Sequence, residues 1–385
     1  MGSVFSAGCS NKLKLGNMSQ KKKVVVGMSG GVDSSVAACL LVEQGYEVIG
    51  ITMKTWDYDM AGLGKSSQKE TGCCSLESIN DARSVAMAKG FLHYTIDFRD
   101  DFGAAVIEYF KEEYLHGRTP NPCVMCNTKV KWDSLLQRAE LLGADYIATG
   151  HYARVRYENG RYRLSKGKDE HKDQSYVLWG LSQRALSKTI FPLAEMTKPE
   201  VRELARQFGL KVADKSESYE ICFIPDNDYE RFLKETVPGL AEKVSGGNIV
   251  DESGRILGKH RGYPFYTIGQ RKGLGLTTPE PVYVTEIQYE TNTIVVGKRE
   301  SLLHRGLIAS QVNWIAFDEL NAPIRATAKI RYKDTPEPCT ITPLPNGMIE
   351  VQFDAPKRAI TPGQAVVFYD QQDVLGGGFI HSVLK

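Results

Sequence analysis

The sequence lacks a long apolar run, a large excess of either charge and a dense set of cysteines. No apolar stretch in its 385 residues approaches the roughly 18 residues that a membrane-spanning helix needs, so an integral membrane protein is excluded. Lysine and arginine number 48 against 46 acidic residues, and the resulting net charge of +2 excludes a uniformly basic nucleic-acid-binding protein. Any polyanionic partner must therefore be bound by local basic patches.

Cysteine is too sparse for a disulfide-stabilised scaffold. Eight cysteines without a secretory signal indicate thiols in a reducing compartment, so we expect a cytoplasmic protein. Internal repeats and low-complexity tracts are lacking as well. Residues 1–20 contain no apolar signal region, and we expect a disordered leader there, with Met18 as a candidate start.

Strand and helix patterns alternate over the first half of the chain. The β-branched run 24–26 predicts a buried strand, and segments 48–51, 94–96 and 146–149 predict further strands, with helical spacing between them. This alternation is typical of an α/β fold in which helices cover both faces of a parallel sheet. After the last of these strands, Asn159-Gly160 predicts the turn of a hairpin.

The character of the sequence changes twice further along. Glycine and proline punctuate short segments over residues 226–299, which predicts a small mixed middle domain. Segments of alternating polarity after residue 300 favour a small β-barrel or sandwich, and we expect a C-terminal β-barrel. We therefore assign residues 1–20 to a leader, 21–225 to the α/β domain, 226–299 to the middle domain and 300–385 to the barrel.

A loop rich in glycine and serine follows the first predicted strand. Between a strand and a helix, glycine lets backbone N–H groups surround an anion, and the helix N-terminus favours negative charge. Serine hydroxyls add donors, and Asp33 is suited to positioning Mg²⁺ beside phosphates. The loop lacks the lysine of the common G-x-x-x-x-G-K-[ST] motif. Its residues are Gly27, Met28, Ser29, Gly30, Gly31, Val32, Asp33 and Ser34.

Three cysteines occur in strings suited to sulfur chemistry. Cys123 and Cys126 lie three residues apart in segment 119–127, and Cys222 lies in segment 218–225. A thiol at the start of the following helix is biased toward thiolate by the helix dipole, as a sulfur nucleophile requires. Taken alone, the C-x-x-C pair is also compatible with a zinc half-site, a redox pair or chance. We expect Cys39 in the core and Cys339 in the C-terminal barrel, and no role for the Cys73-Cys74 pair.

The loop resembles the pyrophosphate loop of the ATP pyrophosphatases, which cleave ATP between the α- and β-phosphates and adenylate a substrate oxygen. With the cysteine strings and segments 150–154, 172–176 and 266–275, residues 21–385 resemble the tRNA-specific 2-thiouridylases. The resemblance implies ATP and Mg²⁺, the anticodon arm of tRNA as substrate, and an upstream protein that donates persulfide sulfur. It implies that the C2 oxygen of the wobble uridine is adenylated and then replaced by sulfur, with release of AMP and pyrophosphate.

The resemblance also implies roles for individual residues. Cys126 is the catalytic cysteine and Cys222 the persulfide carrier, and a transient disulfide between them closes the cycle. Met53 and Gly150 complete the nucleotide site. The positions matching tRNA contacts are Asn121, Pro122, Cys123, His151, Lys172, Asp173, Gln174, Arg331, Tyr332 and Gln364.

The sequence departs from the family at Cys123, where many members carry an aspartate with an acid/base role. Either that role moves to another residue, or Cys123, Cys126 and Cys222 together hold an iron–sulfur cluster with one open iron. The persulfide route predicts no stoichiometric iron in anaerobically purified protein.

The stretch 255–272 holds five basic residues and no acidic one, with aromatic residues between them. One interpretation is an RNA-binding patch whose aromatic rings stack on exposed bases. The other is a solvated basic face over core aromatics. His151 likewise has a structural alternative, a satisfied polar residue at a strand end. The basic residues are Arg255, Lys259, Arg261, Arg271 and Lys272, and the aromatic residues are Tyr263, Phe265 and Tyr266.

Two other functions stay open at this point. One is an ATP pyrophosphatase ligase of another branch that acts on a small metabolite and has no need of Cys126 and Cys222. The other is a non-catalytic tRNA-binding module with a vestigial nucleotide site, although the intact loop argues against it.

Overall fold

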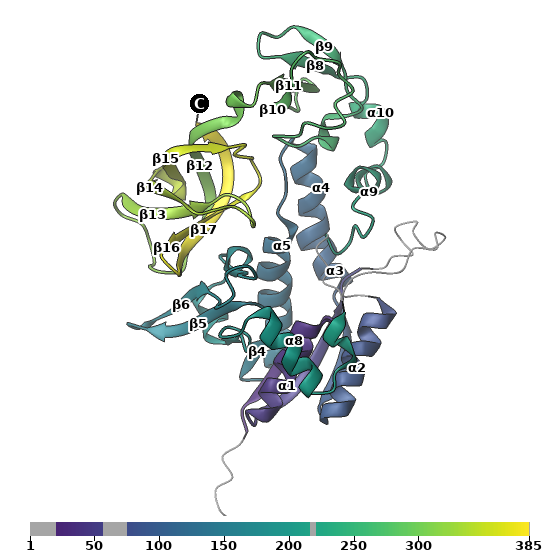
Figure 1. Ribbon diagram of the computed structural model, residues 1–385, viewed down its shortest axis with the longest axis vertical. Coiled ribbons are helices and arrows are strands. Elements are labelled where there is room, and N and C mark those ends of the chain that lie inside the picture. The colour runs from purple at the N-terminus through teal and green to yellow at the C-terminus, as the bar shows by residue number, and fades with distance from the viewer. Residues whose placement is uncertain (1–20, 57–74, 216–220, 385) are drawn as a thin grey trace, which may run out of the picture.

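The computed structural model describes residues 21–56, 75–215 and 221–384. Figure 1 shows a sheet-containing part that is joined by long helices to a middle part at the far end, with a barrel beside those helices. No helix within the described ranges is long and apolar enough to cross a membrane. The expected leader 1–20 and the Cys73-Cys74 pair lie outside these ranges.

Five parallel strands form the sheet of the first part, in the order β3-β2-β1-β4-β7. Val24, Val25 and Val26 of the central strand are fully buried. Val25 packs into one hydrophobic core and its two neighbours into another, so the sheet is covered on both faces. The predicted α/β fold class is confirmed. The strands are β1 (Lys23–Gly27), β2 (Glu47–Lys54), β3 (Leu92–Asp97), β4 (Tyr146–Ala148) and β7 (Thr189–Ile190).

Three helices cover one face of the sheet: α1 (Val32–Glu43), α2 (Leu76–Lys89) and α8 (Lys198–Gln207). Two longer helical runs cover the other face. The first consists of α3 (Arg99–Phe102), η3 (Gly103–Ile107) and α4 (Glu108–Leu115). The second consists of α5 (Pro122–Met125), η4 (Cys126–Leu135) and α6 (Leu136–Leu141). Shorter helices are η5 (Ser175–Val177), α7 (Gln183–Ser187) and η6 (Lys211–Asp214).

A hairpin of β5 (Ala153–Glu158) and β6 (Arg161–Lys166) projects from the sheet-containing part toward the barrel (Figure 1). Its turn residues Asn159 and Gly160 have φ of 51° and 79°, the left-handed values of a two-residue turn, so the predicted hairpin is confirmed. Arg156 binds Asp373 of the barrel through two hydrogen bonds of 2.8 and 2.6 Å, which ties the hairpin to the barrel.

The middle part, which was predicted as a small mixed domain, contains a mixed four-stranded sheet in the order β10-β11-β8-β9. It sits on the end of α4, where the Tyr263 hydroxyl donates to the Leu115 carbonyl at 2.7 Å. Its elements are α9 (Tyr229–Thr236), α10 (Leu240–Val244), β8 (Asn248–Asp251), β9 (Ile256–Lys259), η7 (Tyr263–Phe265), β10 (Tyr283–Gln288) and β11 (Thr293–Gly297).

The C-terminal strands pair in the order β12-β15-β14-β13-β16-β17, and β17 pairs back with β12 to close the predicted barrel. Cys39 is buried in α1 and Cys339 lies in the barrel, as expected, and Cys339 is buried in the barrel core. The elements are η8 (Glu300–Leu302), β12 (Leu303–Trp314), β13 (Ile324–Lys329), β14 (Glu337–Pro343), η9 (Pro345–Gly347), β15 (Ile349–Arg358), β16 (Ala365–Asp370) and β17 (Asp373–Leu384).

Candidate functional site

The loop between β1 and α1 is folded by its own serines. The Ser34 hydroxyl accepts from the Ser29 backbone N–H at 3.2 Å, and the Ser35 hydroxyl donates to the Gly31 carbonyl at 2.8 Å. Gly30 has a φ of +69°, and a side chain there would collide with the Ser78 carbonyl of α2. The loop therefore stands at the positive end of α1 with a backbone conformation that needs glycine.

Asp33 is fixed in the first turn of α1 by two residues from distant parts of the chain. Lys198 Nζ lies 2.8 and 2.7 Å from its two carboxylate oxygens, and the Tyr152 hydroxyl donates to it at 2.8 Å. The Lys198 side chain is only 9% exposed. Asp33 remains the loop's only carboxylate for Mg²⁺, but a cation there would compete with Lys198 for the same oxygens.

Gly150 and Met53 lie at the same edge of the sheet as the loop. Gly150 follows β4, and a Cβ there would lie 2.7 Å from both the Asp33 carbonyl carbon and the Ser34 nitrogen. Met53 is near the end of β2, which pairs with β1. Because the carboxyl ends of neighbouring parallel strands meet at one edge, these residues border a single region, where ligands bind in open α/β sheets.

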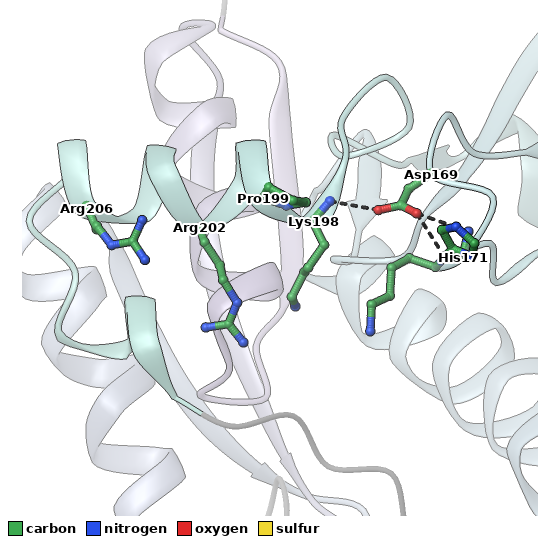
Figure 2. A pocket seen from close by; sticks show the side chains of 7 residues that line it. Asp169, His171, Lys198, Pro199, Arg202 and Arg206 are labelled. Carbon is green, nitrogen blue, oxygen red and sulfur yellow. Dashed lines mark hydrogen bonds between the residues drawn. The ribbon is translucent and has the colours of Figure 1, made fainter.

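A cavity of about 450 Å³ lies beside this edge at the start of α8 (Figure 2). Asp169 organises its wall, because its carboxylate accepts from the backbone N–H groups of Lys198 at 2.9 Å, His171 at 3.1 Å and Lys172 at 3.2 Å. Most of the charged side chains around it are basic, which suits a phosphate-bearing ligand. The lining residues are Asp169, His171, Lys172, Lys198, Pro199, Arg202 and Arg206.

The helix that carries Cys123 and Cys126 begins at Pro122. Proline suits the first helical position, because no intrahelical partner is available there for an N–H group. Cys123 rather than Cys126 is therefore nearest the positive helix end. Cys123 is exposed, while Cys126 is partly exposed and packs against the larger hydrophobic core.

Cys123 is open to water, yet protein surrounds it on most sides. This environment raises the pKa of the Cys123 thiol, and the positive charge of Lys131 opposes the rise. Lys131 Nζ is held by the Asn127 side-chain oxygen at 2.8 Å, and the Asn127 amide in turn donates to the Val177 carbonyl at 3.1 Å. A lysine therefore acts electrostatically on the thiol from within the same helical run.

His151 connects the phosphate side of the site to the cysteine side. Its ring lies 5.7 Å from that of Trp132 in η4, and its Nδ1 is 2.7 Å from the Thr149 hydroxyl. Burial, reinforced by the charge of Lys131, lowers the pKa of His151 well below its ordinary value. Gly150 packs closely against the loop, and the charge of Lys131 acts on both His151 and Cys123.

Cys222 is exposed and is followed by a firmly anchored residue, Phe223. The Phe223 ring packs 5.7 Å from Phe102 and 5.2 Å from Phe110, on the first long helical run. Phe223 therefore holds Cys222 beside the first long helical run. Earlier in the chain, Lys215 binds Asp81 at 2.6 Å and reaches the Gly30 carbonyl at 3.4 Å.

The barrel residues that are predicted to contact tRNA lie where the barrel meets the first part of the chain. The Tyr332 ring is 6.2 Å from Tyr176, and Arg331 donates to the carbonyls of Arg358 and Ala359. Gln364 donates to backbone carbonyls just ahead of Asn121 and Pro122.

Two tRNA-contact candidates of the first part already have protein partners. The Asp173 carboxylate is buried and accepts from the backbone and hydroxyl of Ser175 at 3.0 and 2.9 Å. Burial raises the pKa of Asp173. Gln174 accepts from the Tyr152 N–H at 3.1 Å. Asp173 is thus poorly exposed for RNA, and its role stays a prediction.

The interpretation of stretch 255–272 as a stacking patch is wrong for its aromatic residues. Tyr263, Phe265 and Tyr266 are all buried in the core, so their rings are covered by protein. Of the basic residues, Arg261 pairs with Glu230 at 3.1 Å, whereas Arg271 and Lys272 are exposed. The sequence pattern did not show whether the aromatic side chains point to solvent or to the core, because the hydrophobic residues of this stretch follow no regular period.

The described residues contain no group of three or more histidine, cysteine or acidic side chains arranged to hold a metal ion. Cys123, Cys126 and Cys222 are all described and do not form such a group in this structure, so the iron–sulfur alternative stays a prediction. Lys131, Lys198 and Lys215 were not singled out by the sequence. Of these three lysines, only Lys131 could have been found from the sequence, because Cys123, Asn127 and Lys131 recur at four-residue intervals along one helix.

Sequence-family comparisons cover nearly the whole chain. The tRNA methyl transferase HUP domain matches residues 22–226, the tRNA methyl transferase PRC-barrel domain matches residues 230–298, and the aminomethyltransferase beta-barrel domain matches residues 304–380.

Curated relatives match over almost their full lengths. The tRNA-specific 2-thiouridylase MnmA of Salinibacter ruber is 58% identical over 369 residues, which cover 95% of this chain and 96% of that protein. The protein of the same name from Cytophaga hutchinsonii is 56% identical over 370 residues, covering 96% and 100%. That of Carboxydothermus hydrogenoformans is 52% identical over 366 residues, covering 94% and 99%.

Proposed function

The chain belongs to the family of the tRNA-specific 2-thiouridylases, and on that premise we propose that it uses ATP to replace the C2 oxygen of a tRNA wobble uridine by sulfur. The observation that carries the proposal is the combination, within residues 22–226, of a phosphate loop and two solvent-accessible cysteines, Cys123 and Cys222. The C2 oxygen is a poor leaving group, so a reaction that removes it needs both activation and a sulfur nucleophile.

In the first step the C2 oxygen attacks the α-phosphorus of ATP, and pyrophosphate leaves. The loop's backbone N–H groups and the positive end of α1 stabilise the charge on pyrophosphate. Lys198, which pairs with Asp33, is placed to add a positive charge when phosphates approach. When bound, Mg²⁺ supplies further positive charge beside the phosphates, and Asp33 is the loop carboxylate that would hold it.

In the second step the terminal sulfur of a Cys222 persulfide attacks C2, and AMP leaves. The Cys126 thiolate then attacks Sγ of Cys222. The bond between Sγ of Cys222 and the transferred sulfur breaks, and 2-thiouridine departs. A Cys126–Cys222 disulfide remains. The transferred sulfur gains the two electrons that the two cysteines lose, so the cycle ends in an oxidised enzyme that a reductant and a persulfide donor protein must restore.

Cys123 suits proton transfer better than nucleophilic attack. Desolvation raises the pKa of the Cys123 thiol, and this disfavours the thiolate, which is the nucleophilic form. We therefore propose that Cys123 takes the acid/base place of the family's aspartate, next to the departing AMP. The tRNA-contact positions, among them Arg331 and Tyr332, would hold the anticodon arm over this region, since a wobble base must leave its stack to react.

The cluster-dependent version of the reaction differs in one measurable property. Iron quantification in anaerobically purified protein gives no stoichiometric iron under the persulfide route, whereas one cluster per chain would favour the alternative.

The cysteines provide the test of the function. An unmodified tRNA transcript is incubated with ATP and a persulfide donor, and 2-thiouridine and AMP are measured. We expect Cys126→Ser and Cys222→Ser to abolish 2-thiouridine, because each removes a sulfur that the exchange needs. Cys339→Ala is the matched control: it removes a barrel-core thiol, costs about 1–2 kcal/mol of stability and leaves turnover intact. Thiolation that persists in Cys126→Ser would contradict the proposal.

A further inference from the structure

The segment that leads into the first cysteine pair is held by the barrel. Residues 119–121 run directly into Pro122 and Cys123, and they lie against barrel residues 362–364, more than 240 positions away. Gln364, predicted from the family resemblance to contact tRNA, stands at the centre of this junction.

The N–H groups of Thr119 and Asn121 and the carbonyls of Thr119 and Pro120 are all engaged in hydrogen bonds. Pro120 and Pro122 have no N–H group. The Thr119 N–H donates to the Pro362 carbonyl at 2.9 Å, and the Asn121 N–H donates to the Tyr109 hydroxyl at 3.2 Å. Gln364 Nε2 donates to the carbonyls of Thr119 at 3.1 Å and Pro120 at 2.8 Å. The side-chain amide has two hydrogens, and two carbonyl oxygens accept from it.

Tyr109 of α4 joins the same junction. Its hydroxyl donates to the Gly363 carbonyl at 3.4 Å while it accepts from Asn121, so it bridges the cysteine segment and the barrel loop. Its ring lies 5.9 Å from Phe379 of β17. The hydroxyl is therefore oriented by packing on one side and by two backbone groups on the other.

The junction has no spare room. Gly363 has a φ of +89°, and a Cβ there would lie 2.7 Å from both the Thr119 carbonyl oxygen and a Glu113 carboxylate oxygen. Such contacts are well inside van der Waals separation, so the barrel loop and the cysteine segment approach each other as closely as their backbones allow. A displacement of the barrel loop must move the segment, and with it Cys123.

We propose that Gln364 is a positioning residue that fixes the cysteine segment from the barrel. Its amide sets the backbone of Thr119 and Pro120, and through them the start of the helix that carries Cys123 and Cys126. A tRNA contact through the same nitrogen would compete with these bonds. The expected effect on kcat rests on the proposed function. The expected effect on the position of the cysteine segment does not, because it can be measured without RNA or ATP.

The test uses Gln364→Met, which keeps the length of the side chain and removes both donors. The first measurement is the rate at which iodoacetamide alkylates Cys123 and Cys126 in the full chain without RNA or ATP, read from peptide masses, with Cys222 as the internal reference. We expect a change of about threefold or more for the two cysteines on the helix. The second is turnover against tRNA affinity: kcat should fall about tenfold or more while the Kd for tRNA stays within about twofold, since small misplacements of reacting groups are costly.

Two further variants keep the result interpretable. Gln352→Met is the matched control, because Gln352 is an exposed barrel residue whose amide bonds Glu350, and it should change neither measurement. Gly363→Ala shifts the junction without altering any side chain offered to RNA, and it should reproduce the Gln364→Met pattern.

A different pattern overturns the proposal. If Gln364→Met weakens tRNA binding while kcat at saturating tRNA and RNA-free alkylation stay at wild-type values, Gln364 acts through RNA contact. If wild type itself lacks thiolation, the proposed function fails. The positioning role is then still decided by the alkylation rates of Cys123 and Cys126, because a changed rate in Gln364→Met supports it and an unchanged rate contradicts it. If Gln364→Met does not fold, Gly363→Ala decides by the same two measurements, and an unaltered alkylation rate in it contradicts the proposal.

Discussion

The chemistry of Cys123 depends on two opposing influences that meet at one side chain. Surrounding protein disfavours the thiolate and raises the thiol pKa, while Lys131 favours the thiolate. Asn127 holds that lysine at 2.8 Å, so the positive charge has a fixed position. The spacing of these residues along the helix was visible in the sequence, but the degree of burial was not, because it depends on elements that pack from elsewhere in the chain.

Replacing Lys131 by methionine should shift the titration of Cys123 upward. The variant loses the charge that opposes the rise in pKa, so the pH midpoint of Cys123 alkylation moves further above the ordinary thiol value of about 8.5. Peptide mass spectrometry over a pH series measures it. Lys129→Met is the control on the same helix, because Lys129 is exposed and pairs with Asp133. A midpoint that stays or falls in Lys131→Met would show that Lys131 does not act on the thiol.

His151 should make the folded protein sensitive to acid. Its pKa is lowered well below 6.5, so below about pH 6.5 the unfolded chain binds a proton that the folded chain does not. The unfolding free energy therefore falls as the pH drops from 7.5 to 5.5, by up to about 1.4 kcal/mol per pH unit for this group. Urea unfolding at both pH values measures the loss.

The matched variant for this prediction is His151→Gln. It keeps a polar side chain beside Thr149 and removes the titrating group, so its pH dependence should be smaller than that of wild type. His93 and His260, whose pKa values burial also lowers, account for the dependence that remains. Equal pH dependence in both proteins would refute the role of His151.

At the scale of elements, the nucleotide region depends on how closely the end of β4 and the start of α8 approach the loop between β1 and α1. The strand, loop and helix around residues 24–41 follow from local patterns: a β-branched run, glycines and then helical spacing. Gly150 and Lys198 reach the same loop from distant positions, and only the packed fold shows it. Local periodicity thus predicts the elements, while the partners of Asp33 depend on tertiary packing.

Gly150→Ala tests this close approach. The added methyl group would lie 2.7 Å from Asp33 and Ser34 backbone atoms, so the loop must shift. Overpacking of this kind costs about 1–3 kcal/mol, and we expect ATP binding to weaken about tenfold or more. Calorimetric or equilibrium binding of ATP measures it.

Gly103→Ala is the matched glycine control, because a Cβ there has nothing within 4 Å and the residue lies in a helical run. It should bind ATP like wild type and gain up to about 1 kcal/mol of stability. Wild-type ATP affinity in Gly150→Ala would show that the loop tolerates displacement and would contradict the assigned geometry.

At the scale of the whole molecule, the barrel and the middle part are arranged around the helices that border the site (Figure 1). The barrel meets the cysteine segment through Thr119 and Gln364, and the middle part meets α4 through Tyr263 and Leu115. The predicted basic and aromatic stretch shows the limit of sequence reasoning here. Its composition suited RNA, but its aromatics form the core of the middle part, since an irregular segment gives no period from which to infer its buried face.

The central claim is that the phosphate loop and the cysteines serve one reaction. The most direct measurement follows wild-type enzyme with an unmodified tRNA transcript, ATP and a persulfide donor, and quantifies AMP and wobble-position 2-thiouridine in the same sample. We predict that both products form together, at least one AMP for each thiouridine, and that neither accumulates when ATP is omitted. Thiouridine formed equally without ATP, or ATP cleaved to ADP instead of AMP, would contradict the account.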